Sequence, residues 1–149
     1  MRPTANPVSI ATITLPSTLA APPPPVSVRV LIVDDMVSNR KFLCKALGSL
    51  ECHVITMQAG DGCDAVDIIK QSSSLNAPVD IVFMDSQMVT MDGPAATDII
   101  RNQLKFPGMI IGVTGDPNSI EPFKRAGADD VYLKPIKLQD TKNIIDGKV

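Results

Sequence analysis

The chain has 149 residues, of which 44% are hydrophobic and 20% are charged, and its formal net charge at pH 7 is −2. This length and apolar content suit one globular domain with a single core, and the low net charge argues against a nucleic-acid-binding surface. No apolar run approaches the ~20 residues that a membrane-spanning helix needs. From the charge and from the absence of such a run, we expect neither nucleic acid nor a membrane as a partner.

Cysteine and histidine usage excludes several kinds of site. The three cysteines, Cys44, Cys52 and Cys63, form no CxxC pair, and His53 is the only histidine. A zinc site, a disulfide framework and a histidine-dependent triad are therefore disfavoured. Reduced thiols fit an intracellular protein, so we expect a cytoplasmic location and leave a nuclear one open.

The first 27 residues differ in composition from the rest of the chain. They contain seven prolines, no acidic residue and one basic residue, Arg2. The proline run over 22–25 favours polyproline II and is unsuited to a packed core. A transit peptide would also lack acidic residues, but it would be rich in arginine. We predict a disordered, proline-rich tail over 1–27 and a folded domain over 28–149.

Five short apolar segments follow the tail. The expected strands cover residues 28–33, 52–57, 81–84, 109–113 and 131–133. The first, third and fourth are nearly continuous runs of aliphatic residues and methionine, which is typical of strands buried on both faces. The second alternates apolar with polar residues, which suits an edge strand, and the QAGDG that follows it is an ordinary turn signal.

Helical patterns lie between these segments and after the last one. In the first, Ser38 is the expected N-cap of a helix whose inward face holds Leu43, Ala46, Leu47 and Leu50. The second is expected over 61–71, the third after Asp92 and Gly93, and the fourth after Asp116 and Pro117. The last is short, with Leu138, Thr141 and Ile145 on one face. Strands that alternate with helices predict an α/β fold, a doubly wound, five-stranded parallel sheet covered on both sides.

Polar residues follow four of the five strands, at the sheet edge where ligands of such folds lie. They are Asp34 and Asp35, Asp85, Thr114 and Lys134. Three clustered carboxylates repel one another unless a proton or a cation joins them, and their hard oxygens suit Mg²⁺. With an ammonium and a hydroxyl beside them, they form a site for a phosphoryl group. Asp85, alone at the end of the central strand, is the best candidate for a nucleophile on phosphorus.

The chain resembles the response-regulator receiver domains, a CheY-like family. The resemblance covers about residues 28–146 and is carried by the motifs LIVDDMVSNR, VFMDSQMVTMDG, IIGVTGD and AGADDVYLKPI. It implies the flavodoxin-like strand order 2-1-3-4-5. The segment MDSQMVTMDG is most similar to receivers of hybrid kinases and multistep phosphorelays.

The resemblance also implies a role for each site residue. Asp85 would be the phosphoacceptor, and Thr114 and Lys134 would bind the phosphoryl oxygens and couple phosphorylation to a shift of the face formed by the fourth helix, fifth strand and fifth helix. The implied Mg²⁺ ligands are Asp34, Asp35, Asp85 and the carbonyl of Gln87.

The implied phosphodonor is a phosphohistidine on a histidine kinase or a histidine phosphotransfer protein. Only 14 residues follow Pro135, so we expect no attached output domain. The expected output is partner binding or phosphate shuttling by a monomer. Beyond self-phosphorylation from a donor and slow autodephosphorylation, no enzymatic activity is expected.

Two departures and two alternatives bear on this interpretation. Val89 stands where many members have proline, and Val131 stands at the position of the usual switch aromatic. Tyr132 follows one residue later and should face the other side of the sheet. An aspartyl-phosphate phosphohydrolase commonly has an acid two residues after its nucleophile, where this chain has Gln87. A degenerate interaction module without phosphorylation is disfavoured because all five strand-end residues are intact.

Overall fold

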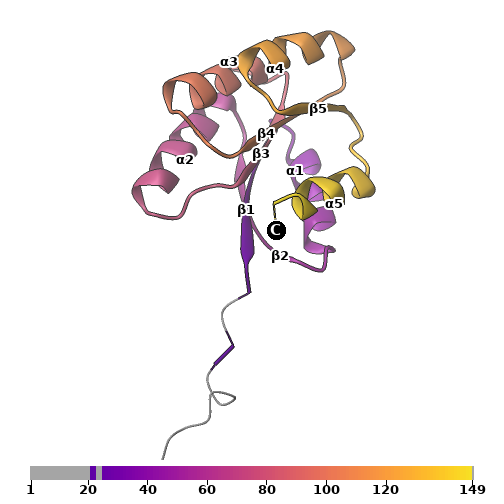
Figure 1. Ribbon diagram of the computed structural model, residues 1–149. Helices are drawn as coiled ribbons and strands as arrows, with labels where there is room; N and C mark the ends of the chain where they lie inside the picture. The colour runs from indigo at the N-terminus through magenta and orange to yellow at the C-terminus, as the bar shows by residue number, and fades with distance from the viewer. Residues whose placement is uncertain (1–20, 23–24, 149) are drawn as a thin grey trace, which may run out of the picture.

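The computed structural model describes residues 21–22 and 25–148 (Figure 1). Most of the tail predicted over 1–27 lies outside these residues. The first strand begins at Ser27, one residue earlier than expected. Among the described helices, none combines the length and the apolar character that crossing a bilayer requires.

Five strands form one parallel sheet in the order β2-β1-β3-β4-β5, so the predicted doubly wound sheet and its strand order are confirmed. β2 lies at an edge, as its alternating pattern predicted. The strands are β1 (Ser27–Val33), β2 (His53–Ala59), β3 (Ile81–Asp85), β4 (Met109–Thr114) and β5 (Asp130–Leu133).

Helices cover both faces of the sheet, with α1 and α5 on one side and α2, α3 and α4 on the other (Figure 1). Their bounds are α1 (Val37–Gly48), α2 (Gly62–Ser74), α3 (Gly93–Asp98), α4 (Ile120–Ala126) and α5 (Leu138–Asp146). A π-helical turn, η3 (Ile99–Gln103), extends α3, and a 3-10 turn, η4 (Pro117–Ser119), precedes α4.

Two details of the predicted helices are wrong. Ser38 is not the N-cap of α1, because the helix begins at Val37 with Met36 as its cap residue. The Asp34 carboxylate accepts a hydrogen bond from the Met36 amide at 2.8 Å, and this contact bends the chain before Val37, so the helix begins ahead of Ser38. Leu50 lies beyond the end of α1, although it still packs against the core cluster that contains Leu43 and Leu47. Leu138 is the first residue of α5 and is 54% exposed.

The strands divide the core into two layers. Along β1, Leu31 and Val33 pack on the side of α2 to α4, whereas Val30 and Ile32 pack on the side of α1 and α5. The same alternation separates Val131, which joins the first layer, from Tyr132, which joins the second. Adjacent residues of a strand point to opposite faces, so the prediction that Tyr132 faces away from the usual switch side is confirmed.

Gly93 and Gly112 allow Phe123 to pack directly beneath the carboxyl edge of the sheet. Phe123 is fully buried. A Cβ on Gly112 would lie 2.9 Å from its ring, and one on Gly93 would lie 2.6 Å from the ring and overlap the backbone oxygen of Asp85. The missing side chains at Gly93 and Gly112 therefore bring α4 against the strands that carry the predicted site.

Candidate functional site

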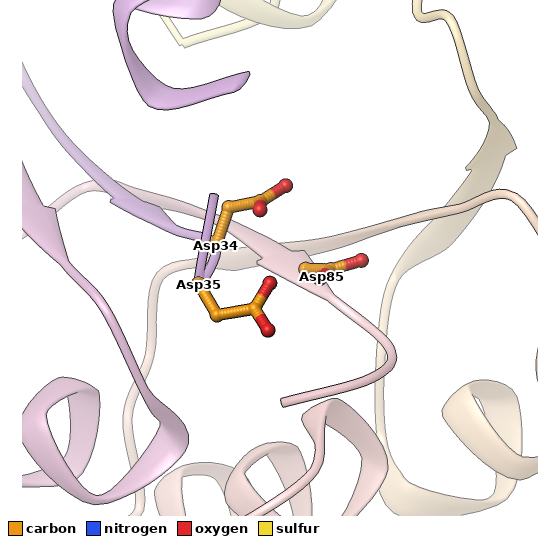
Figure 2. A group of neighbouring side chains, drawn as sticks. All are labelled: Asp34, Asp35 and Asp85. Atoms are coloured by element: carbon orange, nitrogen blue, oxygen red, sulfur yellow. The ribbon is translucent and has the colours of Figure 1, made fainter. Parts of the chain in front are cut away.

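Three carboxylates from the ends of β1 and β3 converge at one place. Asp34, Asp35 and Asp85 each offer an oxygen, and these oxygens lie within 4.8 Å of one another (Figure 2). Asp34 and Asp85 are buried, whereas Asp35 is exposed. β1 and β3 are neighbours in the sheet, so Asp85, the last residue of β3, meets the two residues that follow β1. The juxtaposition predicted from the strand ends is therefore present.

Lys134, which follows β5, lies between the two buried carboxylates. Its Nζ donates to Asp34 Oδ2 and to Asp85 Oδ1, each at 2.9 Å. Burial raises the pKa of Asp85, although the hydrogen bond and charge of Lys134 act against this rise. Burial lowers the pKa of Lys134, but the hydrogen bonds and charges of Asp85 and Asp34 outweigh it and raise the pKa overall. Lys134 is therefore a firmly protonated cation at neutral pH.

The donors around Asp34 leave it fully engaged with the protein. Besides Lys134 and the Met36 amide, its carboxylate accepts from Nδ2 of Asn39 at 3.1 and 3.3 Å. By contrast, no hydrogen bond within the described part of the chain ends on the Asp35 carboxylate or on Oδ2 of Asp85. Because no described protein donor contacts these oxygens, they are more open to a metal ion or a reacting group than the oxygens of Asp34. They are hard, negatively charged oxygens from neighbouring carboxylates, and Mg²⁺ prefers ligands of this kind.

Thr114, at the end of β4, is fully buried and hydrogen bonded to its neighbours. Its Oγ1 lies 2.6 Å from Oγ of Ser86 and accepts from the Asp116 amide at 3.0 Å.

Gln87 lies exposed in the loop after β3, and its role as a metal ligand stays a prediction. Sequence reasoning missed Ser86 and Asn39. A polar residue beside Asp85, and an amide one turn into the helix after Asp34, were the available signals.

Asp61 is a further residue that the turn signal QAGDG did not reveal. Its carboxylate caps α2 through the Cys63 amide at 3.0 Å, and it also accepts from the amides of Thr90 at 2.8 Å and Met91 at 3.2 Å. These backbone hydrogen bonds, led by that of Cys63, lower the pKa of Asp61. Asp61 thereby fastens the loop after Asp85 to α2, in the region where Val89 replaces the common proline.

A cavity of about 310 Å³ adjoins the carboxylates. Its polar wall contains Asp34, Asp85 and Lys134, and its apolar wall includes Phe42 and Pro135. Phe42 is 60% exposed, and Met36 and Val37 beside the site are 57% and 51% exposed. An apolar surface therefore borders the acidic site on the side of α1.

The 2-1-3-4-5 sheet and the acidic cluster at its carboxyl edge define a CheY-like α/β protein. The family described as "Response regulator receiver domain" matches residues 30–146, and the chain belongs to this family. It is a receiver of the multistep-phosphorelay type, a phosphoacceptor class rather than a classical enzyme.

The similar proteins differ in length: the match covers most of some relatives and only a small part of others. The two-component response regulator ORR42 of Oryza sativa subsp. japonica is 34% identical over 119 residues, which cover 80% of this chain and 85% of that protein. The osmosensing histidine protein kinase SLN1 of Saccharomyces cerevisiae is 31% identical over 121 residues, which cover 80% of this chain but 10% of that protein.

Solved structures agree with the sequence relatives. A chain of the CheX–CheY–BeF3–Mg complex from Borrelia burgdorferi matches with a TM-score of 0.69 and 26% identity, covering 81% of this chain and 88% of that one. A chain of the complex between the histidine phosphotransfer protein Ypd1 and the Ssk1 receiver of Saccharomyces cerevisiae also has a TM-score of 0.69 and 26% identity. That match covers 82% of this chain and 88% of that one.

Proposed function

We propose that Asp85 accepts a phosphoryl group from a phosphohistidine and that the phosphorylated domain signals through partner binding or passes the group on. The observation that carries this proposal is Lys134 Nζ, which lies 2.9 Å from Asp85 Oδ1 in a cluster of three carboxylates. A fixed cation beside a buried carboxylate stabilises the negative charge of a transferring phosphoryl group.

The proposed transfer balances without a further reactant. A carboxylate oxygen of Asp85 forms a bond to phosphorus while the bond from phosphorus to the donor imidazole nitrogen breaks, and that nitrogen keeps the electron pair of the broken bond. Because the other ring nitrogen of the donor carries a proton, the ring leaves as a neutral imidazole. Oδ2 suits the attack because, within the described residues, it accepts no hydrogen bond. Lys134 and Thr114 hold the phosphoryl oxygens, and the resulting acyl phosphate hydrolyses slowly because Gln87 is not an acid.

Asp34, Asp35, Asp85 and the carbonyl of Gln87 are the proposed Mg²⁺ ligands. Bound Mg²⁺ neutralises charge on the phosphoryl oxygens. Exposed Asp35 is the most available carboxylate, since Asp34 is engaged by Lys134, Met36 and Asn39. Asp35→Asn should weaken Mg²⁺ binding measured by NMR chemical-shift titration. Asp64→Asn, which changes an exposed acid at the start of α2, should leave that affinity unchanged.

The proposed donor is a histidine kinase or a histidine phosphotransfer protein, and the Ypd1–Ssk1 complex among the structural matches supports this class. The donor must approach over the carboxyl edge of the sheet. The exposed apolar residues Met36, Val37 and Phe42 border that edge, and we assign them to the docking surface. The three free cysteines are consistent with a reducing, intracellular location.

One experiment tests the proposal against its alternatives. The protein is incubated with Mg²⁺ and acetyl phosphate, and its intact mass is followed with time. We expect one phosphoryl group per chain, labile to base, absent in Asp85→Asn and absent when Mg²⁺ is chelated. Repeated release of phosphate without a stable adduct would favour the phosphohydrolase, and a wild-type protein that gains no phosphoryl group would be a degenerate module.

A further inference from the structure

Ser86 and Thr114 face each other across the ends of β3 and β4. The preceding residues, Asp85 and Val113, are register partners in the sheet, which brings the next two side chains together. Ser86 is 5% exposed and Thr114 is 0% exposed. Their hydroxyl oxygens lie 2.6 Å apart, and the geometry permits either one to donate.

Counting protons and acceptors decides the direction of this hydrogen bond. Within the described residues, Thr114 is the only partner of the Ser86 hydroxyl. If Thr114 donated, the proton of Ser86 would be buried without an acceptor, which costs free energy. If Ser86 donates, Thr114 Oγ1 accepts from Ser86 and from the Asp116 amide. Both of its lone pairs are then used, and its own proton remains free for an acceptor.

The proton of Thr114 has a weak acceptor in this structure. The carbonyl of Asp116 lies 3.3 Å from Thr114 Oγ1, which is long for a hydrogen bond between oxygen atoms. If that proton turns to a more strongly charged oxygen, only this weak hydrogen bond to the Asp116 carbonyl is lost. Ser86 and the Asp116 amide occupy the acceptor side of the same hydroxyl, so its proton is the part that remains to be redirected.

We propose that Ser86 is a positioning residue, which donates to Thr114 Oγ1 and so directs the single Thr114 proton to a phosphoryl oxygen on Asp85. The inference rests on the proposed phosphorylation of Asp85 and adds a residue to it. The backbone of Ser86 is already fixed, because its amide donates to Asp85 Oδ1 at 2.9 Å and its carbonyl accepts from the Gly93 amide at 2.8 Å. The backbone that carries the Ser86 side chain is therefore held in place by groups independent of Thr114.

A double-mutant cycle with beryllofluoride and Mg²⁺, a stable phosphoryl mimic, tests this assignment. Binding is titrated by NMR for the wild type, Ser86→Ala, Thr114→Ala and the double variant. Ser86→Ala should weaken binding about three- to tenfold, the size expected for one hydrogen bond. In the Thr114→Ala background, the same substitution should have no further effect, because Ser86 acts only through Thr114.

Further variants separate a positioning role from packing. Ser86→Thr keeps a donor and should bind the mimic within about twofold of the wild type. If Ser86→Ala does not fold, Ser86→Cys takes its place in the cycle, since a thiol is a weak donor and should weaken binding in the same way. Wild-type affinity in the donor-lacking variant, or an equal loss in both Thr114 backgrounds, would overturn the inference. A wild-type protein that neither binds the mimic nor gains a phosphoryl group would instead overturn the proposed function.

Discussion

Lys134 and Asp85 lie 49 residues apart in the chain, yet their side chains form a hydrogen bond of 2.9 Å. The same ammonium group also reaches Asp34, so one cation neutralises part of the charge of two buried acids. Burial of these carboxylates without a cation would be costly. The unphosphorylated site is therefore held together by the same lysine that we propose for the phosphoryl group.

Lys134→Met should destabilise the fold by about 1–2 kcal/mol at pH 7, because it leaves two buried acids without their cation. Since the folded pKa of Lys134 is raised above 10.5, this stabilisation is fully present below pH 10.5 and is lost as the pH rises through the raised pKa. Urea denaturation of both proteins from pH 7 to pH 11 measures the difference. Lys142→Met, which breaks an exposed pair of 3.7 Å, should cost less than about 0.5 kcal/mol. A constant difference over this pH range would contradict the assignment.

Asp61→Ala should destabilise the protein by about 1–2 kcal/mol, because one carboxylate both caps α2 and anchors the loop after Asp85. The pKa of Asp61 is lowered from 3.8, so this contribution is present above about pH 4 and is lost as the pH falls through the lowered pKa. Hydrogen exchange should accelerate at the amides of Thr90 and Met91. Asp64→Ala on the same helix should leave these two amides protected; faster exchange there in both variants would show a general loosening of α2.

Gly93→Ala should destabilise the fold by about 1–3 kcal/mol, because its Cβ would overlap the backbone oxygen of Asp85 and press on Phe123. Gly115→Ala is the matched control, since nothing lies within 4 Å of a Cβ at that position, and it should change stability by less than about 0.5 kcal/mol. Thermal denaturation compares the two variants. Equal midpoints would mean that the loop after β3 yields to the added methyl group.

Phe42→Ala should slow phosphoryl transfer from a phosphorylated histidine phosphotransfer protein by about tenfold, the loss typical of an exposed aromatic contact at an interface. Transfer from acetyl phosphate should be unchanged, because that donor needs no docking surface. The rate of phosphoryl transfer from each donor is measured by intact mass spectrometry of the protein at successive times. Leu75→Ala, a 75% exposed position at the end of α2, should affect neither reaction. Equal slowing with both donors would place Phe42 in the chemistry rather than in docking.

Several residues of the site were predictable because strand ends of a parallel sheet share one edge. Asp34, Asp35, Asp85 and Lys134 each follow an apolar run, so their convergence needed only the strand assignment and the parallel order. The N-cap of α1 was not predictable from Ser38. The start of α1 depends on the hydrogen bond from the Met36 amide to the Asp34 carboxylate. This hydrogen bond favours a helix that begins at Val37 over one that is capped by Ser38.

The amino-acid sequence by itself determined the alternation of strands and helices, the edge position of β2 and the identity of the acidic cluster. These features follow from hydrophobic period and from residues adjacent to strand ends, which are local properties. Only the tertiary structure decided that Asp61 fastens the loop after Asp85 and that Ser86 meets Thr114. Those partners lie 29 or 30 and 28 residues away, and hydrogen-bond geometry between distant segments is set by the packing of the whole sheet.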